Sequence, residues 1–572
     1  MSGKRNFLNP YNFIPLPKEG CHRESHNKGK LTGYIECELE TKTHVFIPNQ
    51  QENDNKEALS FYSYPDSPNQ PVIPGSELRG CIRSVFEVIT NSCMSTSEDV
   101  KFANRSGVRG YKKAGLLKKE DDKWNLYEAN SFPMYDVKRV DENKYKFGEF
   151  QFDFRTGDFI EGDFDSRYPN EPRERLHLKG YVFLGEYFND DRNDHLFEFK
   201  DKSNPIKKDC KIEVENLEEI LKRYRNPKIN KQLENTDERK HYGYPDYDLE
   251  KHNVMPVWYE KGEQGKFYLS PAAIGKNVYY KTLYDFLKRD GESKGYQPCS
   301  DREALCPACN LFGMISNSGS VNSRVRFSDA IYKDVDFPYA KEAKLKELAT
   351  PQIGNTEFYT NSINKNGTKV NFDTTGVDIK GRKFYWHNPN PTYTNEILFN
   401  ERCKLVKPLK EHLHFTFKIF FDHVNEKELN LLAYALDFGS SGKDQCHKIG
   451  MGKPLGIGSV KIKVKAIKQR KVSVQDNNIK YELLDFNRNL KCVDTSTLIM
   501  QNLLKITNFN AFTELKKSFA QKNEELIYDY PRVGQQQNAS DTKQGSLKWF
   551  VNNANAKNPI KLGTIDIPTV PE

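Results

Sequence analysis

The sequence contains no uninterrupted run of roughly 18 apolar residues, the length that a helix needs to cross a membrane. At its start, Asn and Pro residues interrupt the apolar side chains of MSGKRNFLNPYNFIPLPKEG, so no apolar core of a secretory signal peptide is present. We therefore expect a cytoplasmic protein that makes no contact with a membrane.

The sequence also lacks a strong excess of either charge. Lys and Arg number 87 against 79 Asp and Glu, a net charge of +8 over 572 residues. Nucleic-acid binding would therefore depend on local clusters of basic residues. Apolar residues are scarce at 37%, which indicates an extended or partner-covered surface. Aromatic residues make up 12%, which excludes a chain that is disordered throughout, and the length predicts about four domain-sized units.

A strand followed by a helix is predicted in the first hundred residues. Residues 31–47 alternate polar and apolar side chains, as a half-buried strand does. After Pro74 and Gly75, Ser76 is expected to cap a helix. The apolar residues with helical spacing in it are Ile82, Val85, Phe86 and Ile89.

A second set of elements follows much later in the chain. Residues 323–330 and 414–421 are predicted strands, 426–438 a helix and 459–467 a last strand. A β-α-β sequence, a long excursion, a further strand and a second β-α-β sequence predict an α+β fold of the ferredoxin-like or RNA-recognition type. Two helices would cover one face of its antiparallel sheet, and the other face would be open to nucleic acid.

Two stretches separate these elements. Residues 94–298 mix short aromatic strands with charged loops, which favours a large inserted region with a helix near 214–224. Residues 331–410 are rich in turns, and TTGVDIKGRKFYW (374–386) is predicted to form a hairpin. We find no tandem repeat.

Eleven cysteines without secretory features predict reduced thiols rather than disulfides. The segment CSDREALCPACNLFG places Cys299, Cys306 and Cys309 at C-x6-C-x2-C spacing. The C-x2-C pair can direct two thiolates to one tetrahedral ion, and the third cysteine can fold back to it. These cysteines therefore predict a structural Zn²⁺ site, with buried free thiols as the alternative.

A tetrahedral zinc site needs a fourth ligand. Cys93, at the end of the first predicted helix, is the leading candidate. The motif CHRESH offers Cys21, His22 and His26 as a second source. Nothing in the sequence identifies the acidic partner that a catalytic zinc ion would need.

The segment from Lys448 to Lys471 carries eight basic residues and no acidic one. Its glycines would let the backbone approach a phosphate, and Lys453 would add charge. These glycines are Gly450, Gly452, Gly456 and Gly458. The lysines at 461, 463 and 465 alternate, so they share one face of a strand, which suits a phosphate backbone. The alternative is a solvated edge strand protected by lysines.

Two weaker candidates for RNA contact have ordinary alternatives. Residues 101–124 contain eight basic residues against three acidic ones, but this pattern is also typical of a charged loop. The residues in it that could bind RNA are Arg105, Arg109, Tyr111, Lys112 and Lys113. In 331–410, Tyr359, Tyr385 and Trp386 could stack on bases, although core packing explains aromatic side chains more often.

Four blocks occur together in a familiar order: IPGSELRGCIRSVFE (73–87), CPACNLFG (306–313), RVRFSDA (324–330) and GKPLGIGSVKIKV (452–464). This combination resembles the RAMP superfamily of CRISPR-associated proteins, specifically the backbone subunits of type III effector complexes. The resemblance implies a palm of RNA-recognition topology, a thumb-like β-hairpin excursion and stacking along a guide RNA. The cysteine cluster resembles the structural zinc site of several members.

The resemblance also divides the chain. The predicted parts are 1–93 for the first part of the palm, 94–298 for the insertion, 299–330 for the zinc knuckle and a palm strand, 331–410 for the thumb-like excursion, 411–470 for the second half of the palm and 471–572 for a C-terminal extension. Contacts to guide RNA are implied for two of the blocks. The predicted RNA-binding residues are Ser76, Arg79, Arg83, Gly456, Ile457 and Gly458, to which the basic cluster adds Lys453 and Lys461.

Ribonuclease activity in this family depends on one Asp in the loop before the IPGS block, together with a divalent ion such as Mg²⁺. Here the loop offers Asp54, Glu57 and Asp66. Asp66 precedes Ser-Pro as in the family, but the family's acid usually lies further upstream, near Leu59 in this chain. Asp66 is therefore the candidate catalytic residue, and a turn-forming role is its alternative.

The first hypothesis is an RNA-binding subunit that holds guide RNA and positions target RNA, together with other CRISPR effector subunits, in antiviral defence. The alternative is a divalent-metal-dependent endoribonuclease that cleaves target RNA within that complex. A third is a guide-processing nuclease. It would need a general base from among His22, His26, His44 and His447, none of which the sequence pairs with a partner.

Overall fold

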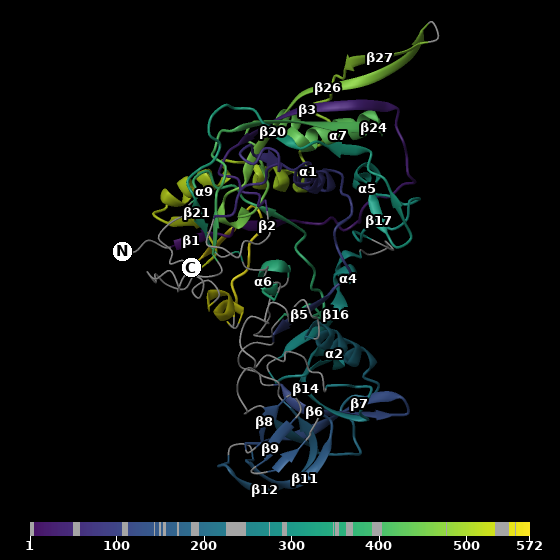
Figure 1. Cartoon of the computed structure of the whole chain (residues 1–572), viewed down its shortest axis with the longest axis vertical. Coiled ribbons are helices and arrows are strands. Elements are labelled where there is room, and N and C mark those ends of the chain that lie inside the picture. The colour runs from purple at the N-terminus through teal and green to yellow at the C-terminus, as the bar shows by residue number, and fades with distance from the viewer. Residues whose placement is uncertain are drawn as a thin grey trace. The chain divides into compact units, whose positions relative to one another are not determined.

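The computed structural model has a mixed α+β fold made mostly of sheet, which confirms the predicted class (Figure 1). It describes residues 5–49, 58–105, 112–135, 137–141, 144–147, 150–152, 156–168, 171–184, 194–224, 247–273, 275–288, 295–346, 348, 354–361, 370–391, 403–475, 478–531, 548–554, 556 and 558–571. Within these ranges, no helix is long and apolar enough to span a membrane.

The chain forms two compact units. Unit 1 consists of Met1–Asp99, Leu283–Val370 and Asp378–Glu572, and unit 2 of Val100–Thr282 and Asn371–Val377. The short segment 371–377 therefore belongs to unit 2, although it lies far from the rest of that unit in the sequence.

An eight-stranded antiparallel sheet forms the centre of unit 1. Its main path is β25 (His447–Lys448), β26 (Ser459–Gln475), β3 (Leu31–Thr41), β24 (His414–Val424), β20 (Ala330–Tyr332) and β4 (Val72–Ile73), with β19 (Val325–Phe327) paired to β24 and β27 (Asn478–Asp485) to β26. Helix α1 (Gly75–Ile89) follows β3 in the chain, and α7 (Glu426–Asp437) connects β24 to β26.

The alternation in β3 separates the two faces of this sheet. Ile35, Cys37 and Leu39 are buried in one core cluster with residues of α1 and α7, whereas the residues between them are only partly buried. The predicted strand at 31–47 is thus real, but it ends at Thr41. The strand at 414–421 and the helix at 426–438 are also confirmed, and α7 begins with a capping box between Asn425 and Glu428.

The expected cap of α1 by Ser76 is wrong. The helix begins at Gly75, and Pro74 at the N-cap position makes no side-chain cap bond. The Gly75 N–H instead donates to Oδ1 of Asp329 at 2.7 Å. A carboxylate from a distant segment therefore satisfies the end of the helix and also favours its dipole.

The hairpin predicted for 374–386 is also wrong. Strand β22 (Arg382–Tyr385) pairs antiparallel with β2 (Tyr11–Ile14) rather than with a neighbouring segment. Gly381 adopts a φ of +125°, and a Cβ there would lie 2.0 Å from the Ile14 carbonyl oxygen. The glycine thus allows the chain to approach a distant strand closely. In the sequence alone, the same glycine suggests a turn.

The last predicted strand, 459–467, is longer than expected. β26 continues to Gln475 and pairs with β27 up to Asp485, so that the two strands form an arm that projects from the sheet (Figure 1). Val472 pairs with Tyr481 and Val474 with Ile479 on one side of this arm.

Unit 2 contains a seven-stranded antiparallel sheet. Its order is β11 (Phe159–Ser166), β12 (Glu174–Phe183), β13 (His195–Phe199), β7 (Lys123–Pro133), β6 (Lys113–Glu120), β14 (Val254–Lys261) and β15 (Phe267–Ser270). Helix α2 (Lys211–Tyr224), close to the predicted 214–224, shares a core cluster with β6 and β14 through Leu217 and Leu221. Phe372 of the segment 371–377 stacks on Phe102, with ring centroids 4.1 Å apart.

Smaller elements complete the two units. The remaining strands are β1 (Arg5–Leu8), β5 (Lys101–Arg105), β8 (Val137–Asp141), β9 (Lys144–Phe147), β10 (Phe150–Phe152), β16 (Lys276–Thr282), β17 (Met314–Ser316), β18 (Gly319–Val321), β21 (Ala343–Leu345), β23 (Lys404–Val406), β28 (Glu525–Tyr528) and β29 (Thr569–Pro571). The other helices are α4 (Leu283–Leu287), α5 (Pro307–Phe312), α6 (Thr356–Tyr359), α8 (Leu498–Thr507) and α9 (Ala511–Ala520). Single 3-10 turns are η1 (Glu263–Gly265), η2 (Gly439–Ser441) and η3 (Lys453–Leu455).

Candidate metal centre and nucleic-acid interface

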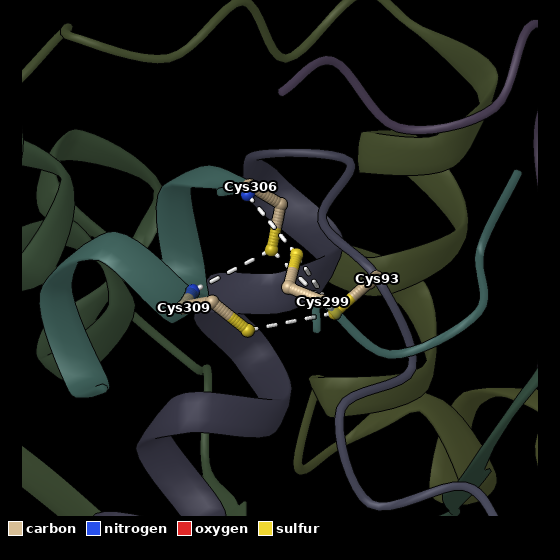
Figure 2. Close-up of side chains that lie close together, drawn as sticks. All are labelled: Cys93, Cys299, Cys306 and Cys309. Carbon is tan, nitrogen blue, oxygen red and sulfur yellow. Dashed lines mark hydrogen bonds between the residues drawn. The ribbon is translucent and has the colours of Figure 1, made fainter. Parts of the chain in front are cut away.

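Four buried cysteines of unit 1 converge in one cluster (Figure 2). The sulfurs of Cys93, Cys299, Cys306 and Cys309 all lie within 4.8 Å of one another. Cys93 Sγ is 3.5 Å from Cys306 Sγ, 3.6 Å from Cys309 Sγ and 3.9 Å from Cys299 Sγ. A tetrahedral zinc ion with Zn–S bonds of about 2.3 Å holds its sulfurs about 3.8 Å apart. The spacing of this cluster therefore fits a four-cysteine metal site.

The knuckle is held by backbone hydrogen bonds to sulfur. Cys306 stands at the N-cap of α5, where its sulfur accepts the Cys309 N–H at 3.5 Å. The Cys306 N–H donates to Cys299 Sγ at 3.3 Å. Side-chain hydrogen bonding with Cys306, Cys309 and Cys93 lowers the pKa of Cys299 far below its ordinary value. This hydrogen bonding favours the thiolate at Cys299, and the thiolate is the form of cysteine that binds metal.

The expected fourth ligand, Cys93, is the one that the fold brings to the cluster. The residues of CHRESH make other contacts. Cys21 Sγ donates to the Gly295 carbonyl oxygen at 3.0 Å, and the His22 ring pairs with Glu24 at 2.9 Å. His26 Nδ1 lies 2.7 Å from Asn310 Oδ1.

Two arginines surround the cysteine cluster. Arg83 donates to Cys309 Sγ at 3.4 Å and to the Gly313 carbonyl oxygen at 3.1 Å. Arg382 donates to the Cys93 carbonyl oxygen at 3.4 Å, and both guanidinium groups pair with Glu87, at 3.1 Å and 3.2 Å. Four thiolates and one Zn²⁺ carry a net charge of −2, so nearby guanidinium groups would help to neutralise a loaded site.

Arg79 and Arg83, one turn apart on α1, have different surroundings. The Arg83 side chain is 13% exposed and makes the contacts to Glu87 and Cys309. Arg79 is half-buried, donates to the Phe312 carbonyl oxygen at 2.5 Å and lies 5.8 Å from the Phe312 ring. Ser76 is exposed on the same helix. Of the three predicted RNA-binding side chains in this block, Ser76 is exposed, and Arg79 is half-buried without the ion pair and sulfur contact that Arg83 makes.

Gly80 is an exposed glycine in the middle of α1. Nothing lies within 4 Å of the position that a Cβ would occupy. A glycine inside a helix costs about 1 kcal/mol relative to alanine, and no described residue packs against the position in a way that requires it. Without a side chain at Gly80, the backbone of α1 is exposed between Ser76 and Arg83.

The glycine-rich loop uses its backbone amides within the protein. The Gly450 N–H donates to Glu77 Oε1 at 2.7 Å, the Gly456 N–H to the Lys453 carbonyl oxygen at 3.1 Å and the Gly458 N–H to the His44 carbonyl oxygen at 2.8 Å. All three glycines have positive φ values. These glycines therefore serve the fold of the loop, and the three amides are already hydrogen-bonded.

The side chains of this loop are also engaged. Ile457 is fully buried in the core of unit 1. The Lys453 ammonium donates to the Gly450 carbonyl oxygen at 2.7 Å and lies 3.8 Å from Glu77. Lys453 is only half-buried, so its charge remains accessible from the surface.

The lysine stripe of β26 lies against a row of glutamates. In the sheet, Lys461 pairs with Glu40 and Lys463 with Glu38 of β3. A bulge follows Val464, and the Lys465 ammonium lies 3.3 Å from Glu38. Lys461 also donates to the Lys443 carbonyl oxygen at 2.6 Å. Because neighbouring strands carry opposite charges, the open face is much less positive than the sequence of β26 suggests.

Asp66 is exposed and lies in a turn, where the Ser67 N–H donates to the Tyr64 carbonyl oxygen at 3.0 Å. Asp54 and Glu57 lie outside the described residues. Across the part of the chain that the structure describes, the four cysteines are the one group of three or more metal-binding side chains that come together.

The weaker RNA candidates are mostly internal. Trp386 is fully buried, while Tyr359 and Tyr385 pack against a core cluster that contains Tyr11. Lys112 is buried and donates to Asn277, whereas Lys113 is exposed. The side chains of Arg105, Arg109 and Tyr111 lie outside the described part of the structure. Of the histidines, His447 is buried and donates to the Leu436 carbonyl oxygen at 2.8 Å.

Two charged residues of RVRFSDA, Arg324 and Asp329, have structural roles that the sequence did not indicate. Besides accepting the Gly75 N–H, Asp329 accepts the Tyr64 hydroxyl. Arg324 is buried and donates to Glu428 Oε2 at 2.9 Å. These two residues tie the block to the starts of α1 and α7. The only signal in the sequence was the presence of charged residues in an otherwise strand-like segment.

Residues 278–461 match the RAMP superfamily. This segment of the chain belongs to the RAMP superfamily. The matched RAMP segment includes the cysteine knuckle, β19, β24 and the glycine-rich loop, whereas α1 and Cys93 precede it. No curated protein matches the chain.

Solved structures also match the chain, among them the crystal structure of Thermofilum pendens Csc2. The two chains share 14% identity with a TM-score of 0.13, and the match covers 38% of this chain and 45% of that chain. The match therefore spans less than half of that protein. At this TM-score the likeness supports no argument about fold or function.

Proposed function

We propose that this chain is an RNA-binding subunit of a type III CRISPR effector complex. In this role it holds guide RNA and positions target RNA, with other effector subunits as neighbours, in antiviral defence. The observation that carries the proposal is the RAMP match over residues 278–461, which contains β19, β20, β24 and β25 of the central sheet and helix α7.

The topology of that sheet supports the proposal. Its four main segments follow the order β26, β3, β24 and then β19 with β20, all antiparallel, with α1 and α7 as the two helical connections. The proposed ferredoxin-like or RNA-recognition-type palm would have this order. Helices cover one face of such a palm, and RNA can reach the other face and the connecting loops.

We place the guide RNA along the exposed side of α1. Ser76 and Arg79 can donate to phosphate oxygens, and Gly80 lets the backbone of a strand approach the helix closely. Lys453, whose ammonium lies near Glu77 of the same helix, adds positive charge there. Arg83 supports the cysteine cluster in this arrangement rather than contacting RNA.

We also propose that the four-cysteine cluster binds one structural Zn²⁺. The sulfur spacing and the two neighbouring arginines support this assignment. A loaded site would tie the end of α1 to α5 and stabilise the RAMP segment that follows.

Binding of single-stranded RNA by the purified full chain tests the proposed function. We expect fluorescence anisotropy to report binding of a labelled single-stranded RNA that weakens steeply with salt, because phosphate contacts release counterions. Duplex DNA of the same length is the control for general polyanion binding. A chain that binds neither RNA nor its complex partners, or that prefers the DNA, contradicts the proposal.

Target cleavage is the second candidate function, and the exposed position of Asp66 favours it. The assembled complex is incubated with matched target RNA and Mg²⁺, with and without EDTA. If this chain cleaves, Asp66→Ala should reduce the rate about 100-fold while guide binding persists. Asn69→Ala, in the same exposed loop, is the matched control. If Asp66→Ala cleaves the target RNA at the wild-type rate, Asp66 is not catalytic and serves only to form the turn.

A further inference from the structure

The segment that follows β20 carries an exposed aromatic side chain between two ammonium groups. Phe337 is 62% exposed, although most aromatic residues of unit 1 are buried. The Lys407 ammonium lies 5.7 Å from the centre of its ring, and the Lys410 ammonium 5.6 Å. We infer that Phe337, Lys407 and Lys410 form a stacking platform for an unpaired base of single-stranded RNA.

The platform is held in place before any ligand arrives. The Lys410 ammonium donates to the Phe337 carbonyl oxygen at 2.8 Å, and the Lys410 N–H donates to the Pro338 carbonyl oxygen at 2.9 Å. Tyr339 packs edge-on against the Phe337 ring, with centroids 5.5 Å apart. A ring fixed in this way loses little freedom when a base stacks on it.

The chemistry around the ring favours nucleic acid over a protein partner. A base can stack on an exposed aromatic face whatever its sequence, and flanking ammonium groups can reach the phosphates on either side. Residues 333–344 and 404–410 together hold six lysines and three acidic residues. Bases of a duplex are already stacked on each other, so the ligand must be single-stranded or locally unpaired.

The position of the platform deepens the proposed function, on which this inference rests. The Tyr339 hydroxyl donates to the Asn69 carbonyl oxygen at 3.5 Å, so the platform adjoins the loop that carries Asp66. RNA on this side of unit 1 would therefore place an unpaired nucleotide next to the loop that carries Asp66.

The test compares Phe337→Ala with Phe337→Trp in the full chain, with a labelled 15-nucleotide single-stranded RNA as the probe. Loss of the ring should weaken binding about tenfold, and tryptophan should keep or improve it because stacking needs only an aromatic face. Phe159→Ala removes a similarly exposed phenylalanine (55%) in unit 2 and should leave the affinity unchanged. Lys407→Ala and Lys410→Ala should each lower the salt slope by about 0.7.

The possible outcomes separate this inference from the proposed function. If the wild-type chain binds no RNA, both fail. If the wild type binds RNA and Phe337→Ala binds it as tightly as Phe159→Ala does, the platform is refuted and the proposed function stands. If Phe337→Ala keeps its RNA affinity but loses association with another protein chain, the patch is a protein contact and the platform is again refuted. Melting curves of each variant verify that it is folded.

Discussion

Arg79 and Arg83 illustrate how two similar residues, one helical turn apart, take different roles. We expect Arg79→Ala to weaken RNA binding and to flatten its salt dependence by about one phosphate contact, since Arg79 is only half-buried. Arg83→Ala should instead destabilise the protein, because Glu87 and Cys309 lose a buried partner. Salt titrations of binding and thermal melting of both variants measure the two effects. Equal losses of RNA affinity in both variants would contradict this division.

His447 gives a pH dependence of stability. Burial lowers the pKa of His447 to about 4, from an ordinary value near 6.5. Between these two pH values the unfolded chain binds a proton that the folded chain excludes, so the free energy of unfolding falls as the pH drops. The full effect is about 3 kcal/mol. We expect His447→Gln to show a shallower loss of melting temperature between pH 7 and 4.5.

The control for that experiment is His22→Gln, because the His22 side chain is 79% exposed. This variant should follow the wild-type curve. If the melting temperatures of wild type and His447→Gln fall equally between pH 7 and 4.5, burial of His447 does not contribute to acid sensitivity.

At the scale of elements, the cysteine knuckle links the end of α1 to α5. We predict about one zinc ion per chain and its release by Cys306→Ser or Cys309→Ser, because each sulfur is one of four ligands. Elemental analysis measures the zinc, and melting curves should show loss of stability rather than selective loss of one activity. Cys492→Ser, a partly exposed cysteine outside the cluster, is the matched control. A metal-free preparation with unaltered melting would leave the four residues as ordinary thiols.

The segment 371–377 is held in unit 2 by an aromatic side chain and by Asp373, which accepts the Tyr268 hydroxyl and the N–H groups of Tyr280 and Lys281. Phe372 is buried, stacks on Phe102 and contacts Tyr279. Phe372→Ala should therefore cost about 3–5 kcal/mol of unfolding free energy. The exposed Thr375→Ala should cost less than about 0.5 kcal/mol. Urea denaturation, together with hydrogen exchange in unit 2, measures the stabilities of the two variants. Equal stabilities would mean that the segment does not anchor there.

At the scale of the whole molecule, the arm of β26 and β27 extends the central sheet into solvent. Val472 and Val474 are 52% and 72% exposed on it, whereas Ile467 is 4% exposed within the sheet. Val472→Ser and Val474→Ser should each change the unfolding free energy by less than about 0.5 kcal/mol, and Ile467→Ser should cost at least about 2 kcal/mol. Urea denaturation tests this contrast. A large loss from the valine variants would show that the arm is part of the core.

The local sequence determined several elements of this protein. The alternation of β3 and β24, the helical spacing of α1 and the cysteine spacing each report interactions over a few residues, and the structure contains all of them. The choice of Cys93 followed from its place at the end of α1. Local sequence patterns predict these elements because burial of one face of a helix or strand makes apolar residues recur at a regular spacing along the chain.

Only the tertiary structure decided which side chains meet across long distances. The cap of α1 came from Asp329, the partner of β22 from β2 and the charge balance of the β26 lysines from β3. Arg83 was drawn to the cysteine cluster, and Phe337 was left exposed between two lysines. Strand register and ion pairs depend on residues hundreds of positions apart, which no local period encodes.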